Sequence, residues 1–217
     1  MTAHWSEKKN MLLDNAIAII DYNMGNLRSV EKAFQKIGAR STITNDPQVI
    51  QRSDKIVLPG VGAFKEGIGE LKKLGLIDLL NEEVIEKKKF FLGICLGMQL
   101  VGSKSYETEE TKGFDWIKGE VVKFEGENLK VPHVGWNNIS FTKTHALFEN
   151  IPDQTDFYFV HSYYFKSDTE YATSHTNYGV DFVSSVNKEN IFGCQFHPEK
   201  SQKFGLEILK NFINLKK

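Results

Sequence analysis

Short apolar runs alternate with helix-like segments through the first half of this chain, and this alternation constrains its fold most. Residues 16–20 are continuously apolar, as expected for a strand covered on both faces. Apolar side chains recur at helical spacing over residues 27–37, Gly38 ends that segment, and later helical segments run to about Lys88. Further strands are predicted at residues 39–44, 55–58 and 90–94. This order predicts βαβ units and an α/β fold with a mostly parallel sheet.

The second half changes character, because turn residues separate short β-like runs between Trp116 and Ser185. These predicted strands span residues 120–124, 138–141, 156–165, 171–176 and 182–186. Residues 106–112, rich in Glu and Thr, are predicted to be a solvated loop. The chain ends in an amphipathic helix with apolar positions at Phe204, Leu206, Ile208, Leu209, Phe212 and Ile213. We predict a polar N-terminal extension at residues 1–14 and a single domain at residues 15–217.

The charge balance and composition exclude several classes of function. Lys and Arg number 27 against 28 Asp and Glu, so no basic excess favours nucleic acid or an anionic membrane surface. No apolar run reaches the roughly 18 residues that span a bilayer, and the N-terminus lacks a signal-peptide core. Cys95 and Cys194 are too few for a disulfide framework and lack zinc-site spacing. We therefore expect a cytoplasmic protein without a metal site.

Cys95 lies between two glycines, where a predicted strand meets a helix-like segment. A reactive side chain on such a sharp turn needs small neighbours, which Gly93 and Gly97 provide. The N-terminus of the following helix favours a thiolate and offers backbone N–H groups to a developing oxyanion. The alternative interpretation of this turn is a plain buried cysteine.

A histidine and a glutamate near the C-terminus complete a candidate triad. His197 and Glu199 are two residues apart, and on an extended segment their side chains point to the same side. Pro198 between them is excluded from a helix interior, which favours the extended conformation. A nucleophilic cysteine needs a base, and the base needs an orienting carboxylate. We predict Cys95, His197 and Glu199 in these roles. Taken alone, His197 would be interpreted as a structural histidine.

Two further features lie near the predicted nucleophile. Residues 59–62 (PGVG) follow a neighbouring predicted strand, and in an open parallel sheet ligands bind at the carboxyl ends of the strands. A backbone N–H of this loop, together with that of Leu96, would form an oxyanion hole; the alternative is a simple Pro-Gly turn. Gln99, one helical turn after Cys95, could bond an amide or α-amino group of a substrate. A solvated or capping glutamine is the alternative there.

Six motifs in this sequence resemble those of a known family. They are residues 21–26 (DYNMGN), 59–64 (PGVGAF), 93–99 (GICLGMQ), 132–137 (PHVGWN), 158–163 (YFVHSY) and 195–201 (QFHPEKS). The elbow and His-Pro-Glu motifs resemble the class I glutamine amidotransferases, and the others resemble the members found in imidazole glycerol phosphate synthases. The resemblance covers about residues 16–215. It implies the class I glutamine amidotransferase (flavodoxin-like) fold, a mostly parallel central sheet with flanking helices and additional strands in the second half.

The resemblance also implies a glutaminase. Cys95 would attack the side-chain amide of glutamine to form a γ-glutamyl thioester, which water then hydrolyses. His197 would shuttle the proton, and Glu199 would orient the imidazole. In this family the ammonia passes through a tunnel to a (β/α)8-barrel cyclase, which makes imidazole glycerol phosphate and an aminoimidazole carboxamide ribotide in histidine biosynthesis. The implied assembly is a heterodimer that uses glutamine and needs no cofactor.

The motifs carry the family's binding positions as well. The resemblance implies substrate-binding roles for Gly60, Val61, Gly62, Leu96, Gln99, His161, Ser162 and Tyr163. It implies a place at the partner interface for Asn23, Asn26, Trp136 and Lys200. For Trp136 and Tyr163, a role as core aromatics is the alternative.

Departures from the family pattern leave the ammonia acceptor open. Residues 101–112 lack the usual apolar, glycine-containing continuation, and residues 113–119 replace a Gly-Leu-Gly-Leu-Ile-Pro-Gly-like segment. Val134 stands where methionine is common. One alternative is therefore a paralogous subunit that supplies ammonia for amidation of a surface-polysaccharide sugar. The others are a stand-alone cysteine hydrolase of the same fold and a binding subunit without activity.

Overall fold

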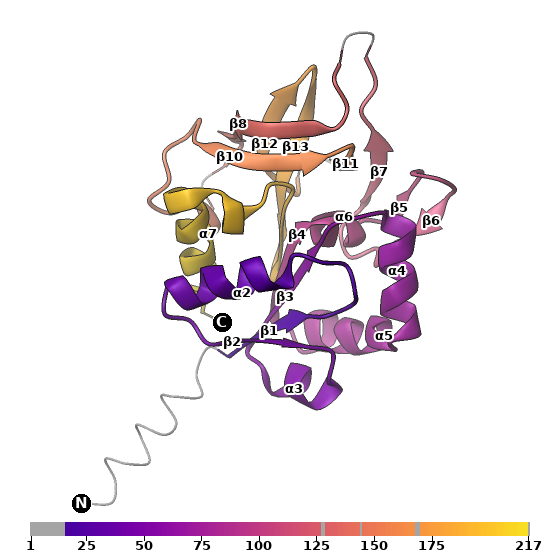
Figure 1. Cartoon of the computed structure of the whole chain (residues 1–217), viewed down its shortest axis with the longest axis vertical. Coiled ribbons are helices and arrows are strands. Elements are labelled where there is room, and N and C mark those ends of the chain that lie inside the picture. The colour runs from indigo at the N-terminus through magenta and orange to yellow at the C-terminus, as the bar shows by residue number, and fades with distance from the viewer. Residues whose placement is uncertain (1–15, 127–128, 144, 168–169, 217) are drawn as a thin grey trace, which may run out of the picture.

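An eight-stranded sheet forms the centre of the computed structural model, which describes residues 16–126, 129–143, 145–167 and 170–216 (Figure 1). The strand order is β2-β1-β3-β4-β14-β13-β12-β9. Five strands are parallel: β2 (Ser41–Thr44), β1 (Ile17–Ile20), β3 (Lys55–Gly60), β4 (Phe90–Cys95) and β14 (Ile191–Cys194). Three antiparallel strands extend one edge: β13 (Val180–Lys188), β12 (Ala172–Tyr178) and β9 (Ser140–Phe141). The predicted mostly parallel sheet, with added strands from the second half, is confirmed.

Helices cover both faces of this sheet. They are α2 (Leu27–Lys36), α3 (Pro47–Arg52), α4 (Phe64–Lys73), α5 (Leu76–Asn81), the π-helical turn η1 (Glu82–Glu86), α6 (Leu96–Leu100) and α7 (Gln202–Asn214). Ile17 and Ile19 of β1 join an apolar cluster with α2 and α7, whereas Ala18 and Ile20 face a second cluster with α4, α5 and α6. Figure 1 shows α2 (indigo) and α7 (yellow) on one side of the sheet and α4 with α5 on the other.

Two smaller sheets extend the structure beyond the central one. The first pairs β8 (His133–Asn138) with β10 (Asp156–His161) in antiparallel fashion. The second has the order β11-β7-β5-β6, with β11 at Tyr163–Ser167, β7 at Gly119–Lys123, β5 at Lys104–Ser105 and β6 at Thr111–Lys112. In Figure 1, β8 and β10 lie above the region where β4 passes into α6. The carbonyl oxygen of Val160 in β10 lies 4.0 Å from Sγ of Cys95, so this strand is next to the predicted nucleophile.

Several predictions of local structure are wrong. The single strand predicted at residues 156–165 divides at Ser162, because β10 pairs with β8 whereas β11 pairs with β7. The strand predicted at residues 138–141 divides at Ile139 into β8 and β9. Part of the predicted loop at residues 106–112 forms β6, since Thr111 and Lys112 pair with β5. The first two changes depend on pairing partners distant in sequence, which local alternation does not reveal, whereas β6 pairs with the nearby β5.

The short helix α3 was not predicted, although its start follows ordinary capping chemistry. Asp46 accepts a hydrogen bond from the backbone N–H of Gln48 at 2.8 Å, and Pro47 occupies the first helical position. Only Ile50 of this helix is buried, so it has too few apolar positions to show a period. No helix in the described ranges is long and apolar enough to cross a membrane. The extension predicted at residues 1–14 lies outside the described residues.

Candidate active site

Cys95 ends β4 and directly precedes α6, with the unusual backbone angles φ 54° and ψ −107°. Such a conformation costs a non-glycine residue on the order of 1–3 kcal/mol, so the surrounding structure must hold it in place. Two glycines permit the close packing that does so. A Cβ on Gly93 would lie 2.5 Å from the carbonyl oxygen of Gly97, and a Cβ on Gly97 would overlap the carbonyl of Leu58. The turn therefore has the sharp strand-to-helix geometry that suits a reactive side chain.

A cavity of about 360 Å³ opens beside the sulfur of Cys95. The Sγ atom lies 4.0 Å from the carbonyl oxygen of Val160 and 3.6 Å from Nε2 of Gln195. Besides Cys95 and Val160, the lining residues are Val61, Gly62, Leu96, Gln99, Glu107, Pro132, His161, Ser162 and Tyr163. Seven of the eight predicted substrate-binding residues are in this wall, and the eighth, Gly60, ends β3 and pairs with Cys95.

His197 and Glu199 are hydrogen-bonded to each other. Nδ1 of His197 lies 2.7 Å from Oε1 of Glu199, and both side chains are buried. The extended conformation predicted for this segment is wrong, because Pro198–Lys200 form a 3-10 turn, η3. Proline is excluded from a helix interior but suits the first position of a helical turn, which is where Pro198 lies. The turn, rather than strand alternation, brings the two side chains together.

The electrostatics of this pair favour a charged imidazole. Burial lowers the pKa of His197, but the Cys95 and Glu199 side chains outweigh burial and raise that pKa to about 10. Because Nδ1 binds Glu199, Nε2 is the nitrogen left for the sulfur, and it has no hydrogen-bond partner among the described residues. A charged imidazole beside the nucleophile carries a proton on Nε2 that it can give to a leaving group.

Hydrogen bonds within the cavity wall limit what two predicted binding residues can offer a ligand. Gln99 donates from Nε2 to the carbonyl oxygen of Tyr163 and to Oε1 of Gln195, both at 3.0 Å. His161 has its Nδ1 2.8 Å from the Tyr163 carbonyl oxygen and its Nε2 3.0 Å from Nδ1 of His133. Burial is the main reason that the pKa of His161 falls to about 3. His161 is therefore a neutral ring whose two nitrogens are both committed to the protein.

One backbone N–H of the loop after β3, that of Val61, is held away from the cavity. The backbone N–H of Val61 donates to the carbonyl oxygen of Met24 at 2.9 Å. Gly62 follows with φ +116°, a conformation that L side chains rarely adopt. The Val61 N–H is thus engaged with the loop at residues 21–26 and is not available to a ligand in this conformation.

Two residues of the site were missed by the sequence analysis. Glu107 lines the cavity and accepts a hydrogen bond from the backbone N–H of Phe64 at 2.6 Å, although its segment was predicted to be solvated. No periodicity marks it, because it lies in a charge-rich bend. Gln195 is fully buried and donates to the Cys95 sulfur. The sequence did indicate Gln195, because this residue begins the motif that contains His197.

Three of the four predicted interface residues lie at the surface, and the fourth, Asn26, turns inward. Trp136 is 48% exposed and contacts Tyr158, and the Lys200 ammonium lies over the same Tyr158 ring. Asn23 is exposed and donates to Glu70 at 2.6 Å. Asn26 instead turns inward and donates from Nδ2 to Oε1 of Glu199.

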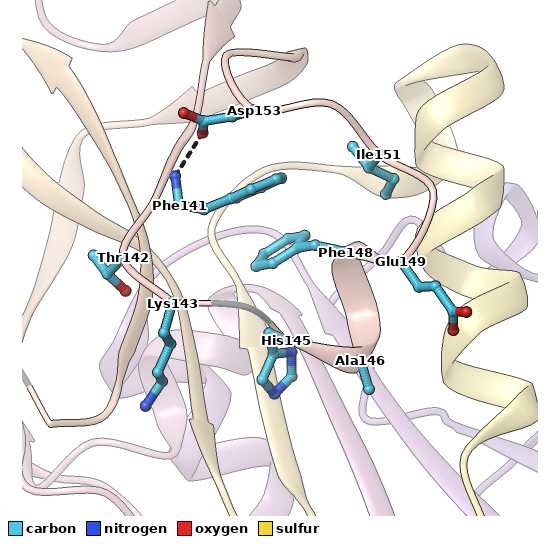
Figure 2. Close-up of a pocket in the computed structure, with 9 residues that line it drawn as sticks. All are labelled: Phe141, Thr142, Lys143, His145, Ala146, Phe148, Glu149, Ile151 and Asp153. Atoms are coloured by element: carbon cyan, nitrogen blue, oxygen red, sulfur yellow. Dashed lines mark hydrogen bonds between the residues drawn. The ribbon is translucent and has the colours of Figure 1, made fainter.

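A larger cavity, of about 720 Å³, lies between β9 and the 3-10 turn at Ala146–Phe148 (Figure 2). The rings of Phe141 and Phe148 stack at its centre, with centroids 4.5 Å apart. Two of its polar side chains bind the protein itself: Asp153 accepts from the Phe141 N–H, and the ring of His145 accepts from the Leu147 N–H. No group of three or more His, Cys, Asp and Glu residues within the described ranges could hold a metal ion. The reactive groups therefore gather at the smaller cavity.

Comparisons with known proteins agree with this geometry. The sequence profile of the family described as Glutamine amidotransferase class-I matches residues 18–215. The imidazole glycerol phosphate synthase subunit HisH 1 of Campylobacter jejuni (strain RM1221) is 52% identical over 200 residues, which are 92% of this chain and 100% of that protein. The subunit HisH 2 of Methanococcus maripaludis is 48% identical over 91% of this chain and 98% of its own length. PurLQS from Thermotoga maritima has a similar fold, with a TM-score of 0.71, 16% identity, and coverage of 93% of this chain and 98% of that one.

Proposed function

This chain belongs to the class I glutamine amidotransferase family, and we infer that it is the glutaminase subunit of an imidazole glycerol phosphate synthase, acting in histidine biosynthesis. The observation that carries this function is the 52% identity to such a subunit over the whole of that protein. The sugar-amidating paralogue and the stand-alone hydrolase are not favoured, because relatives from a bacterium and an archaeon both carry the synthase name. An enzyme of this kind releases ammonia from glutamine.

In the proposed reaction the Cys95 thiolate attacks the side-chain carbonyl carbon of glutamine. His197, whose raised pKa keeps it protonated, gives its Nε2 proton to the departing nitrogen, so that ammonia leaves and a γ-glutamyl thioester remains. The neutral imidazole then takes a proton from water as the water oxygen attacks the thioester carbon. Glutamate leaves, and the thiolate–imidazolium pair is restored. Glu199 supports both proton transfers by fixing Nδ1 of the ring at 2.7 Å.

Each of the two carbonyl additions places negative charge on an oxygen that needs backbone donors. The N–H of Leu96, at the start of α6, and the N–H of Val61 are the proposed donors. Since Val61 donates to Met24 in the described conformation, turnover requires that the peptide before Val61 turn toward the cavity. We expect docking of a partner near residues 21–26 and 59–62 to favour that turn, which would couple glutaminase activity to assembly.

The cavity wall also suggests how the amino-acid end of glutamine is recognised. Glu107 is the acidic member of the wall, and an ammonium group next to its carboxylate forms a charge-assisted hydrogen bond. Ser162 supplies a hydroxyl nearby. We propose glutamine as the substrate, with its α-ammonium at Glu107 and its side-chain amide at Cys95.

The proposed partner is a (β/α)8-barrel cyclase that forms a heterodimer with this chain. Val134 and Trp136 are 55% and 48% exposed, although both are large and apolar, and Lys200 lies on the neighbouring η3 turn. Exposed apolar side chains beside a basic one are typical of a surface that binds protein. The proposed products are imidazole glycerol phosphate and an aminoimidazole carboxamide ribotide, and a cytoplasmic location remains a prediction.

The test is the activity of Cys95→Ala with a histidine-pathway cyclase. Glutamine-dependent synthesis should disappear, while synthesis from added ammonium salt should persist because the cyclase is intact. Cys194→Ala is the matched control, since Cys194 is buried in the core and should leave both activities unchanged. Retention of glutamine-dependent synthesis by Cys95→Ala, or failure of the parent chain to support a histidine auxotroph, would contradict the proposed function.

A further inference from the structure

A loop asparagine, Asn26, contacts the carboxylate beside the candidate base. Its Nδ2 donates to Oε1 of Glu199, across 173 positions of the sequence. The same oxygen receives the Nδ1–H of His197 at 2.7 Å. The three side chains therefore form a continuous line from the loop after β1 to the imidazole next to Cys95.

The side chain of Asn26 does not serve the helix that it precedes. Asparagine before a first helical turn usually accepts a hydrogen bond from one of the free N–H groups there. Asn26 precedes α2, yet in the described part of the chain its side chain makes no such cap bond. Its backbone angles, φ 63° and ψ 3°, are left-handed, a conformation that asparagine tolerates better than most residues. The start of α2 therefore lacks a side-chain cap, and the Asn26 amide binds Glu199 instead.

Few other hydrogen bonds hold the Glu199 carboxylate among the described residues. Its side chain is completely buried, and both of its hydrogen bonds described above end on Oε1. Its second oxygen, Oε2, has no partner among the described residues. Without Asn26, the carboxylate would keep a single donor, and rotation about its last bond would swing Oε1 away from His197. A buried carboxylate held by one hydrogen bond is a poor orienting group.

We propose that Asn26 is a positioning residue of the active site, which fixes the Glu199 carboxylate and through it the ring of His197. This role rests on the proposed function, and it replaces the place at the partner interface that the sequence motif implies for Asn26. It predicts that loss of the Asn26 amide slows the proton transfers without weakening the binding of glutamine or of the cyclase.

The chain offers a closely matched control in the same loop. Asn23 is also left-handed, with φ 65°, and its Nδ2 also donates to a glutamate, the exposed Glu70. Glycine accepts these backbone angles without strain, so Asn26→Gly and Asn23→Gly remove the same amide with the same backbone effect. With the cyclase bound, Asn26→Gly should lower the kcat for glutamine about tenfold, as expected for the loss of one hydrogen bond to a charged group, and leave KM within about twofold. Asn150 is also left-handed, with φ 60°, and is exposed and outside the loop at residues 21–26, so Asn150→Gly should stay within about twofold of the parent in both.

A second measurement does not depend on catalysis. In the full chain labelled with 15N-histidine, the Nδ1–H proton of His197, identified by its absence from His197→Asn, should exchange with water at least about tenfold faster in Asn26→Gly than in Asn23→Gly. Equal exchange in Asn26→Gly and Asn23→Gly, with equal kcat in Asn26→Gly and Asn150→Gly, would overturn the proposal. So would a loss confined to the affinity for the cyclase, which would return Asn26 to the interface. Should the parent chain lack glutaminase activity, the proposed function fails, yet the exchange rates still decide whether Asn26 positions Glu199.

Discussion

Tyr22 carries a hydroxyl group whose removal should stabilise the protein. The side chain is completely buried, and its oxygen has no hydrogen-bond partner in the described ranges. Burial, together with the nearby Cys95, raises the pKa of the phenol. The hydroxyl packs directly against Gly60, where a Cβ would overlap it. Tyr22→Phe keeps the ring and its apolar contacts and removes only the unpaired group.

The size of the effect follows from the cost of that group. A buried polar group without a partner costs about 1–3 kcal/mol, and we take about 1–2 kcal/mol as the gain because the ring remains in place. In a chain of 217 residues, each kcal/mol corresponds to about 2–4 °C in Tm, so Tyr22→Phe should melt about 2–8 °C higher. Urea unfolding should show a higher midpoint with an unchanged slope, since the surface exposed on unfolding is the same.

Tyr178→Phe is the control with the opposite sign. The Tyr178 hydroxyl donates to the carbonyl oxygen of Lys130 at 2.8 Å, so its loss should cost about 0.5–1.5 kcal/mol. If Tyr22→Phe lowered the midpoint as Tyr178→Phe does, the Tyr22 hydroxyl would have a partner in solution, such as a buried water, and the reasoning would be refuted.

Two further predictions concern substrate binding and pH. Glu107→Gln removes the negative charge of the cavity wall, so the KM for glutamine should rise about tenfold or more, which is the equivalent of one charge-assisted hydrogen bond. The kcat should stay within about twofold of the parent. An unchanged KM in steady-state assays would place the α-ammonium elsewhere. Burial lowers the pKa of His161 to about 3 and that of His133 to about 4, so below pH 6.5 the unfolded chain binds protons that the folded chain does not. Urea unfolding should therefore show stability falling by about 2–3 kcal/mol per histidine between pH 6.5 and 4, and His133→Gln should flatten that slope; a pH-independent midpoint in the parent chain would contradict it.

The sequence predicted the parts of the fold whose signal is local. The parallel strands β1, β3 and β4 are buried on both faces, so they appear as short apolar runs. The elbow at Cys95 was also predictable, because a side chain at Gly93 or Gly97 would meet the backbone. Both features are visible in the local sequence, as short apolar runs and as the two glycines that flank Cys95.

Features that depend on distant partners were not predictable in this way. The division of one strand at Ser162 reflects a change of pairing partner, which no local alternation records. Glu107 reaches the cavity from a charge-rich bend, and charge-rich segments are usually solvated. Asn26 is the clearest case, since its bond to Glu199 joins segments 173 positions apart and leaves no trace in the spacing of either motif.

The loop at residues 21–26 touches the site twice, and the two contacts have opposite consequences for any motion of the loop. Met24 withholds the Val61 N–H from the cavity, whereas Asn26 supports Glu199. A partner that pulled the whole loop outward would free the oxyanion donor and release the carboxylate at the same moment. Only a tilt that pivots at Asn26 and lifts Met24 separates the two effects. The proposed activation by docking therefore calls for a rotation of this loop about its C-terminal end, not for its withdrawal.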